Sequence, residues 1–374
     1  MAHSPVTKRS APEEEARAPL ALGLFMPNCS NAYSISTYKP VPDDWTYESN
    51  AQIARAAEVA GFEFLFPVAK WKGYGGKTDF LGISLETMTW AGALLAITRR
   101  INVFSTVHVP IFHPLVAAKM GATLDHIGNG RWGLNVVSGW SEREFGMMGI
   151  EVLPHAERYQ RTEAYIEIVK GLWTCEPGTF EHESKWYRIR GGSVMPQPTR
   201  KPHPPIANAG VSDEAREMVA RLCDWAFIAL PSLEATAQVT ADIRARAGHY
   251  GRSVKCANYP LVVWRETERE AEAERRRIVD HMDREAAENW ARGLLPQSGS
   301  FDDFTLEMFA LGAGALPIFG TREQVAEKLD RLYRCGIDGV LMVFLSYYED
   351  TLRFAREIMP LLRQLGTIGN RSRP

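Results

Sequence analysis

The sequence lacks a charge excess of one sign and lacks a long apolar run. Its 374 residues include 43 basic and 45 acidic side chains, which leaves a formal net charge of −2. Proteins that bind nucleic acid usually concentrate positive charge, so this balance argues against that class. The longest apolar window, Thr87–Ile97, is about half of the roughly 20 residues that span a bilayer. We therefore expect no membrane insertion.

Cysteine is also scarce. The five cysteines are scattered and never form a C-x-x-C pair, a pattern that indicates reduced thiols in a cytoplasmic protein and no structural zinc site. Counting alone leaves catalytic thiol chemistry open. Residues 1–20 carry basic residues, three consecutive glutamates and three prolines, but no apolar segment of the kind found in secretory signals. We expect this segment to form a disordered arm.

From residue 21 onward, short apolar runs alternate with segments of helical period. Continuous apolar runs of this length are typical of strands that are covered on both faces. Alternating strand–helix units specify a parallel sheet, and eight of them favour a closed (β/α)8 TIM barrel with insertions, here one domain at 21–370. The expected strands lie at 22–26, 62–68, 101–107, 132–137, 206–209, 225–230, 259–264 and 339–344.

Two stretches look like insertions into this pattern. Residues 176–204 are rich in glycine, proline and charge, and we expect a small hairpin there that pairs 179–180 with 186–189. Residues 292–317 are too long for an ordinary connection. They form either a lid that excludes water from an active site or a disordered segment.

In such a barrel the active site lies where the strands end. Polar candidates at these ends include Thr106, His108 and Asn135. The set contains no paired carboxylates, and its one close pair of histidines, His108 and His113, is separated by Pro110, so that neither strand nor helix spacing aligns them. We therefore expect no metal site. His108 either faces the substrate or is a hydrogen-bonded loop or core histidine.

Two further features suit a phosphate group. Gly210-Val-Ser212 leads from a strand into a helix, where free backbone N–H groups and a hydroxyl can face an anion. Alternatively, Ser212 only caps that helix. Arg158 and Tyr159 fall in the first turns of another helix, where a guanidinium can hold phosphate; alternatively, Arg158 is a surface residue. The G-x-G-x-x-G string at 128–133 follows a helix and precedes a strand, the reverse of the dinucleotide-binding arrangement.

Several segments resemble the bacterial luciferase-like flavin monooxygenases, and within them the pyrimidine oxygenase and the dimethylsulfone and alkanesulfonate monooxygenases. The strings NVVSGW (135–140) and GYGGKT (73–78) are specific, whereas GTREQ (320–324) marks the superfamily only. The segments ALGLFMPN (21–28) and ERYQR (157–161) add to the likeness. The resemblance covers about residues 21 to 365, nearly the whole chain.

The resemblance implies a barrel that takes reduced FMN from a separate NAD(P)H:flavin reductase and reacts it with O2. It implies that Thr106 and Asn135 flank the flavin edge where oxygen reacts, as in the pyrimidine-oxygenase branch. His108 and His113 depart from the relatives, so we expect the lining of the substrate pocket to differ. The implied flavin contacts are Ala69, Lys70, Asn135, Glu144, Arg158, Tyr159 and Ser212.

We therefore expect a two-component FMN-dependent monooxygenase that oxygenates a small polar or heteroaromatic molecule, with C–N, C–S or C–halogen cleavage. The candidate catalytic residues are Thr106, Asn135 and His108. The alternatives are a deazaflavin-dependent oxidoreductase on the same barrel and a non-catalytic flavin-binding protein. By resemblance we also expect a homodimer or homotetramer. Four aromatic residues either wall the pocket or pack in the core and rim: Trp71, Tyr74, Trp140 and Phe344.

Overall fold

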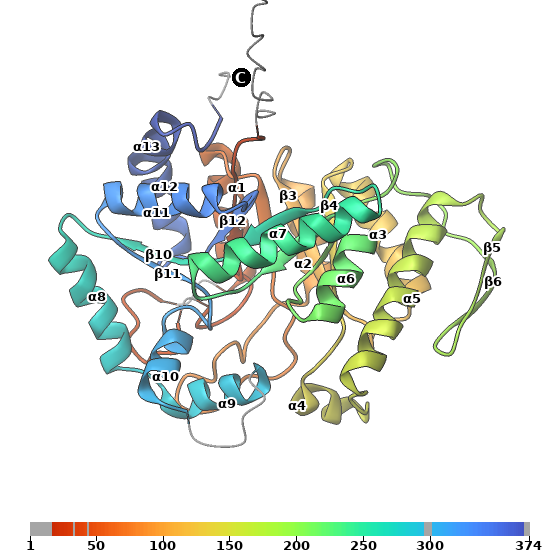
Figure 1. The fold of residues 1–374 in the computed structure, drawn as a ribbon, viewed down its shortest axis with the longest axis horizontal. Helices are drawn as coiled ribbons and strands as arrows, with labels where there is room; N and C mark the ends of the chain where they lie inside the picture. Colours follow the sequence, from red (N-terminus) through yellow and green to blue (C-terminus); the bar gives the residue numbers. More distant parts are fainter. Residues whose placement is uncertain (1–16, 33, 43–44, 295–300, 370–374) are drawn as a thin grey trace, which may run out of the picture.

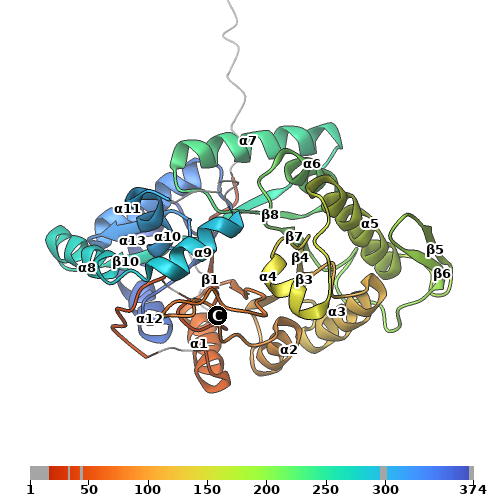
Figure 2. The ribbon, with the colours of Figure 1, turned by 90° about the horizontal axis from the view of Figure 1, so that it is seen from below.

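Eight parallel strands close into a barrel, which confirms the expected fold class (Figures 1 and 2). The computed structural model describes residues 17–32, 34–42, 45–294 and 301–369. The order of strands around the barrel is β1 (Ala21–Phe25), β12 (Gly339–Met342), β9 (Lys255–Asn258), β8 (Trp225–Ile228), β7 (Ile206–Asn208), β4 (Trp132–Val137), β3 (Asn102–His108) and β2 (Phe64–Phe66).

A ring of helices covers the outside of the barrel (Figure 2). Several of them begin where a side chain accepts a backbone N–H of the first turn, as Glu86 does before α2, Ser232 before α7 and Thr321 before α11. Such caps satisfy donors that the helix itself leaves unpaired. The covering helices are α1 (Tyr47–Ala60), α2 (Thr87–Ile97), α3 (Pro114–Gly128), α5 (His155–Thr174), α6 (Asp213–Leu222), α7 (Leu233–His249), α11 (Arg322–Arg334), α12 (Tyr347–Glu357) and α13 (Met359–Gln364).

The alternation of side chains along β3 and β4 separates the barrel interior from the helix layer. The ring of Trp132 points outward, where it packs edge-on against Trp173 of α5 with 5.9 Å between centroids, and its Nε1–H donates to Ser105 Oγ at 3.0 Å. Because neighbouring residues of a strand face opposite sides, the residues next to Ser105, which are Phe104 and Thr106, face the interior. Thr106 pairs in register with Asn135 of β4.

The seventh barrel strand is not the one that the sequence indicated. We expected residues 259–264, but β9 is Lys255–Asn258, which pairs with β8 and β12. Pro260 follows, and the apolar run after it forms β10 (Leu261–Trp264), which pairs with β11 (Pro317–Gly320) in a separate two-stranded sheet. The expectation failed because β10 is buried along its whole length and therefore carries the same apolar signal as a barrel strand.

One end of the molecule carries the elements that cover the strand ends. Figures 1 and 2 show α4 (Glu142–Phe145), α9 (Arg284–Leu294) and α10 (Asp303–Ala310) gathered at the end toward which β4 runs. The long connection between β9 and β12 supplies α9 and α10, together with α8 (Glu268–Asp280). Part of the expected lid or disordered segment at 292–317, residues 295–300, lies outside the described residues.

The other expected peripheral features are partly visible. An antiparallel hairpin of β5 (Phe180–Glu183) and β6 (Arg188–Gly192) projects beside α5, close to the predicted position (Figure 1). Of the expected arm at 1–20, only Arg17 to Leu20 fall within the described residues. Leu20 is buried, and Arg17 Nη2 lies 3.0 Å from Asp338 Oδ1.

No helix in the described ranges is both long and apolar enough to cross a membrane.

The packing of α3 against the barrel generates a test of the fold. A Cβ added at Gly121 would lie 2.4 Å from the Trp132 ring, so Gly121→Ala overpacks this contact. We expect a loss of about 1–3 kcal/mol in the free energy of unfolding, measured by equilibrium denaturation. Gly248→Ala in α7 is the matched control, because a Cβ there meets nothing within 4 Å and alanine favours the helix by about 1 kcal/mol. Equal effects of the two substitutions would contradict this packing.

Candidate functional site

A cavity of about 600 Å³ opens at the carboxyl ends of the barrel strands. It brings together eight of the nine site residues that the sequence indicated. Ser212 does not line the cavity, although its neighbours Gly210 and Val211 do. The eight lining residues are Ala69, Lys70, Thr106, His108, Asn135, Glu144, Arg158 and Tyr159.

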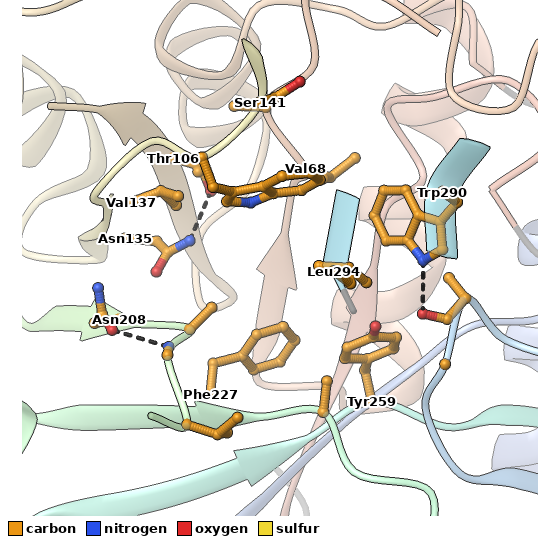
Figure 3. A pocket seen from close by; sticks show the side chains of 18 of the residues that line it. Val68, Thr106, Asn135, Val137, Ser141, Asn208, Phe227, Tyr259, Trp290 and Leu294 are labelled. Atoms are coloured by element: carbon orange, nitrogen blue, oxygen red, sulfur yellow. Dashed lines mark hydrogen bonds between the residues drawn. The ribbon is translucent and has the colours of Figure 1, made fainter. Parts of the chain in front are cut away.

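Thr106 and Asn135 form a hydrogen-bonded chain at the inner face of β3 and β4 (Figure 3). Asn135 Nδ2 donates to Thr106 Oγ1 at 3.2 Å, and Thr106 Oγ1 in turn donates to the carbonyl of Pro67 at 3.1 Å. Asn135 Oδ1 is buried and finds no hydrogen-bond partner among the described residues. The threonine hydroxyl is thus committed to a backbone carbonyl, and the asparagine amide is the group left to meet a ligand.

Lys70 and Glu144 form a buried ion pair beside this chain. Lys70 Nζ lies 3.0 Å from Glu144 Oε1, which also accepts the backbone N–H of Trp71 at 3.3 Å. The pKa of Lys70 lies below its usual range because burial disfavours the ammonium, while Glu144 acts in the opposite direction. The pair fixes the loop after β2 against α4. Glu144 Oε2 has no hydrogen-bond partner in the part of the chain that the structure describes.

Three aromatic rings enclose the Lys70 ammonium, and two of them, Trp140 and Trp290, also line the cavity. The Nζ lies 4.6 Å from the ring centroid of Tyr74, 4.9 Å from that of Trp140 and 5.4 Å from that of Trp290. These cation–π contacts offset part of the cost of burying the charge. Of the four aromatic candidates from the sequence, Trp140 lines the cavity, whereas Trp71, Tyr74 and Phe344 do not.

The residues that the sequence associated with a phosphate group, Arg158, Tyr159 and Ser212, lie on the other side of the cavity, between α5 and α6. Arg158 Nη1 donates to the carbonyl of Gly139 at 3.0 Å, while its Nε is buried without a partner among the described residues. Ser212 Oγ accepts the N–H of Ala215 at 3.3 Å, so the capping role expected for it as one alternative is present. Burial raises the pKa of Tyr159, and a side-chain hydrogen bond with Ser212 opposes that rise.

Gly210 allows the backbone to pass close to this group. A Cβ at this position would lie 2.5 Å from the Ala215 side chain and 2.6 Å from Tyr159 Oη. Asn208 holds the turn, because its Oδ1 accepts the Gly210 N–H at 2.9 Å (Figure 3). Its Nδ2 donates to the Val136 carbonyl at 2.7 Å. Sequence reasoning missed Asn208, whose position at a strand end was its only signal.

An aromatic floor closes the cavity toward the barrel core, and sequence reasoning missed it too. The rings of Phe66 and Phe227 stack with 5.0 Å between centroids, and Phe227 stacks on Tyr259 at 5.3 Å. Phe25 packs against Tyr259 at 4.7 Å. All four line the cavity, and Figure 3 shows Phe227 and Tyr259 below the Asn135 amide. Phe25, Phe66 and Phe227 come from β1, β2 and β8, and Tyr259 directly follows β9, so only the closed barrel places the four rings together.

The remaining wall comes from the connection between β9 and β12. Trp290 donates from Nε1 to the carbonyl of Ala313 at 3.1 Å, which ties α9 to the loop after α10 (Figure 3). Leu294, Phe304 and Met308 line the cavity here, and the Phe304 side chain is 73% exposed. The described part of 292–317 therefore forms a wall of the cavity.

The two histidines differ in position. His113 caps α3 by accepting the N–H of Leu115 at 3.3 Å and does not line the cavity. His108 is the last residue of β3, lines the cavity and is 6% exposed. Burial lowers the pKa of His108 to about 3, and the nearby Lys70 acts in the same direction. His108 is therefore neutral at physiological pH. No group of three or more His, Cys, Asp or Glu in the described ranges is arranged to hold a metal ion.

A parallel (β/α)8 barrel with a cavity at its strand ends is the usual architecture of TIM-barrel enzymes. The model of the luciferase-like monooxygenase family matches residues 21–339, and the chain belongs to this family. The chain is 31% identical over 366 residues to the FMNH(2)-dependent dimethylsulfone monooxygenase of Pseudomonas putida, covering 93% of this chain and 96% of that protein.

A second relative supports the subgroup that the sequence motifs indicated. The chain is 32% identical over 361 residues to the pyrimidine monooxygenase RutA of Acinetobacter baylyi, covering 92% of this chain and 95% of that protein. The crystal structure of the riboflavin lyase RcaE, with modified FMN and riboflavin, aligns with a TM-score of 0.84 at 21% identity over 95% of this chain and 94% of that one. This last likeness shows a shared fold.

Because the pKa of His108 is lowered, we expect the free energy of unfolding to depend on pH. An unfolded histidine titrates near pH 6.5, so between pH 6.5 and pH 5 the unfolded chain gains a proton that folded His108 does not take. The free energy of unfolding must then fall as the pH falls, by about 2 kcal/mol over this interval from His108 alone. His108→Gln should remove this contribution, and His113→Asn should keep it. Denaturation at pH 6.5 and pH 5 measures the difference, and an unchanged pH slope in His108→Gln would contradict the buried neutral state.

Proposed function

We propose that this protein is a two-component monooxygenase that uses reduced FMN and O2 to oxygenate a small polar or heteroaromatic molecule, with cleavage of a C–N, C–S or C–halogen bond. A separate NAD(P)H:flavin reductase supplies the reduced flavin. The proposal is supported by membership of the luciferase-like monooxygenases and by the likeness to relatives named for FMNH(2)-dependent dimethylsulfone and pyrimidine oxygenation.

The observation that carries the proposal is the set of unpartnered polar atoms around an aromatic floor. Asn135 Oδ1, Glu144 Oε2 and Arg158 Nε are buried and without hydrogen-bond partners among the described residues, and all three side chains line one cavity. Buried polar groups usually have partners, so this cavity suits a flat ligand with both donors and acceptors. The isoalloxazine ring of FMN is such a ligand, and the residues present fit it.

The other end of the cavity suits the FMN phosphate. Arg158, the Tyr159 hydroxyl and the N-terminus of α6 after Gly210 would hold this group, because a helix N-terminus and a guanidinium both favour an anion. Of the acidic residues in the first turn of α6, Asp213 is paired elsewhere, because it lies 2.6 Å from Arg246, whereas the Glu214 carboxylate interacts with its own backbone N–H and with Ser212. Ala69 and Lys70 would contact the ring edge from the loop after β2.

When bound, reduced FMN supplies the two electrons that activate O2. The Asn135 amide presents an uncharged donor and acceptor at the strand ends, and Thr106 holds it in place through the hydrogen bond to Oγ1. Neutral groups can orient a developing oxygen anion without transferring a proton to it. The wall formed by α9, α10 and the loop to β11 would exclude water from this place, which is the role we propose for the described part of 292–317.

A binding experiment separates this function from its alternatives. The full-length protein is titrated anaerobically with reduced FMN and with a reduced deazaflavin, and oxygen uptake is then followed with dimethyl sulfone and uracil as test substrates. We expect tight binding of reduced FMN and oxygen uptake coupled to product. Preference for the deazaflavin would favour hydride transfer instead, and FMN binding without any product from a broad substrate panel would favour a non-catalytic flavin-binding protein.

Removal of the amide tests the site directly. We expect Asn135→Ala to retain FMN but to lose product formation by on the order of 10²-fold, the usual effect of deleting one preorganised donor, with hydrogen peroxide released in place of product. Asn102→Ala is the control, because Asn102 lies at the opposite end of β3, where its Nδ2 donates to the Glu63 carbonyl at 3.0 Å. Peroxide and product are measured together, and full product yield from Asn135→Ala would remove this residue from the mechanism.

Assembly and location stay predictions. The proposed enzyme meets its reductase and its small-molecule substrate as diffusing partners, and a homodimer or homotetramer is expected from the family resemblance. All five cysteines are free thiols, which fits the reducing cytoplasm that we propose as its location.

A further inference from the structure

His108 occupies a layer of the cavity wall next to the Thr106–Asn135 pair. It lies two residues beyond Thr106 on β3, and alternate residues of a strand face the same side, so both face the barrel interior. In the register of β3 and β4, Thr106 pairs with Asn135 and His108 pairs with Val137. His108 and Val137 both line the cavity. Because β3 runs toward the mouth, His108 lies nearer to the opening than the amide does.

Trp71 determines which nitrogen of His108 carries the proton. The Trp71 Nε1–H lies 3.3 Å from His108 Nδ1, and an indole nitrogen can only donate a hydrogen bond. The Nδ1 atom must therefore be the acceptor, which leaves the single proton of the neutral ring on Nε2. The Phe145 ring meets the imidazole edge-on at 5.6 Å between centroids and restrains its orientation.

The Nε2–H donor has no acceptor among the residues that the structure describes. The contact with Trp71 is the one hydrogen bond that the His108 side chain makes to the described residues. Nε2 is not one of the fully enclosed polar atoms that lack a partner, so its N–H is open to the cavity that His108 lines, where a ligand atom can accept it. The residue is thus a fixed, uncharged donor near the mouth of the site.

None of the charged side chains among the described lining residues is left to pair with a charged substrate. Among the described lining residues, the formal charges at neutral pH are those of Lys70, Glu144 and Arg158. Lys70 and Glu144 neutralise each other at 3.0 Å, and the proposed function assigns Arg158 to the FMN phosphate. A sulfonate or carboxylate substrate would enter without a counter-ion, and burial of an unpaired charge is strongly disfavoured.

We propose that His108, with its proton held on Nε2 by Trp71, is the specificity-determining residue for an uncharged substrate that carries an oxygen or nitrogen hydrogen-bond acceptor, such as a sulfone, an amide or a nitrogen heterocycle. This inference rests on the proposed function, because it concerns the second ligand of the same cavity. It excludes alkanesulfonates and carboxylates as substrates. Trp71 acts as a positioning residue, since it touches His108 and does not line the cavity.

Steady-state kinetics with four proteins test the proposal. The wild type, His108→Leu, His108→Gln and the control His113→Asn are assayed with dimethyl sulfone, uracil and methanesulfonate, with reduced FMN supplied in excess. We expect turnover of at least one neutral probe and none of methanesulfonate. His108→Leu should raise KM for the neutral probe about tenfold, the effect of one lost hydrogen bond, with kcat changed far less. His108→Gln keeps a side-chain N–H donor and should restore most of the loss.

Flavin affinity and the imidazole proton provide readouts that do not depend on turnover. The Kd for FMN should be the same in the wild type, both His108 variants and the control, so a parallel loss of FMN binding would assign His108 to the flavin and overturn the proposal. Nitrogen-15 NMR of the histidine rings should show a neutral, Nε2-protonated His108. Trp71→Phe should raise KM for the neutral probe and shift this tautomer signal, without changing the Kd for FMN.

The outcomes separate the inference from the proposed function. Coupled turnover of methanesulfonate, or equal KM values in the wild type and His108→Leu, would overturn the role of His108 and leave the flavin monooxygenase in place. FMN binding without affinity for any uncharged probe would likewise overturn it. Failure of the wild type to bind reduced FMN would remove the proposed function and this inference together.

Discussion

The hydrogen bond between Asn135 and Thr106 is the interaction on which the site depends. It exists because β3 and β4 are paired in parallel with these two residues opposite each other and because both face the barrel interior. A shift of one residue in either strand would turn that strand's side chain into the helix layer and break the pair. The contact between Trp132 and Ser105 on the outer face of the same two strands holds this register. The register of β3 and β4 therefore sets both the packing of the core and the position of the Asn135 amide.

The centre of the site carries uncharged side chains, and the charged side chains of Lys70 and Glu144 at its edge are paired with each other. The ion pair of Lys70 and Glu144 is buried under aromatic rings, and the buried His108 stays uncharged. Lysine, glutamate and histidine are therefore present without presenting a mobile proton to the centre of the cavity. This arrangement suits oxygen chemistry, in which an early proton transfer ends the productive reaction. It also explains why the strand ends contain few carboxylates.

The sequence allowed the barrel and most of the polar site to be predicted, for a definite physical reason. Parallel strands covered on both faces leave continuous apolar runs, and strand ends in such a fold converge on one place, so Thr106, His108 and Asn135 could be placed from their positions alone. The seventh strand was misplaced, because the buried side sheet that contains β10 gives the same signal as the barrel strand β9. The aromatic floor could not be found, since Phe66, Phe227 and Tyr259 come together only when the sheet closes.

The central claim is that the cavity at the strand ends holds FMN between the Asn135 amide and the N-terminus of α6, above the aromatic floor. A crystal structure of the protein soaked with FMN tests it most directly. The account predicts density for the isoalloxazine against Asn135 and density for the phosphate beside Arg158 and Gly210. A cavity that stays empty at saturating FMN, or a flavin bound elsewhere on the barrel, would contradict it.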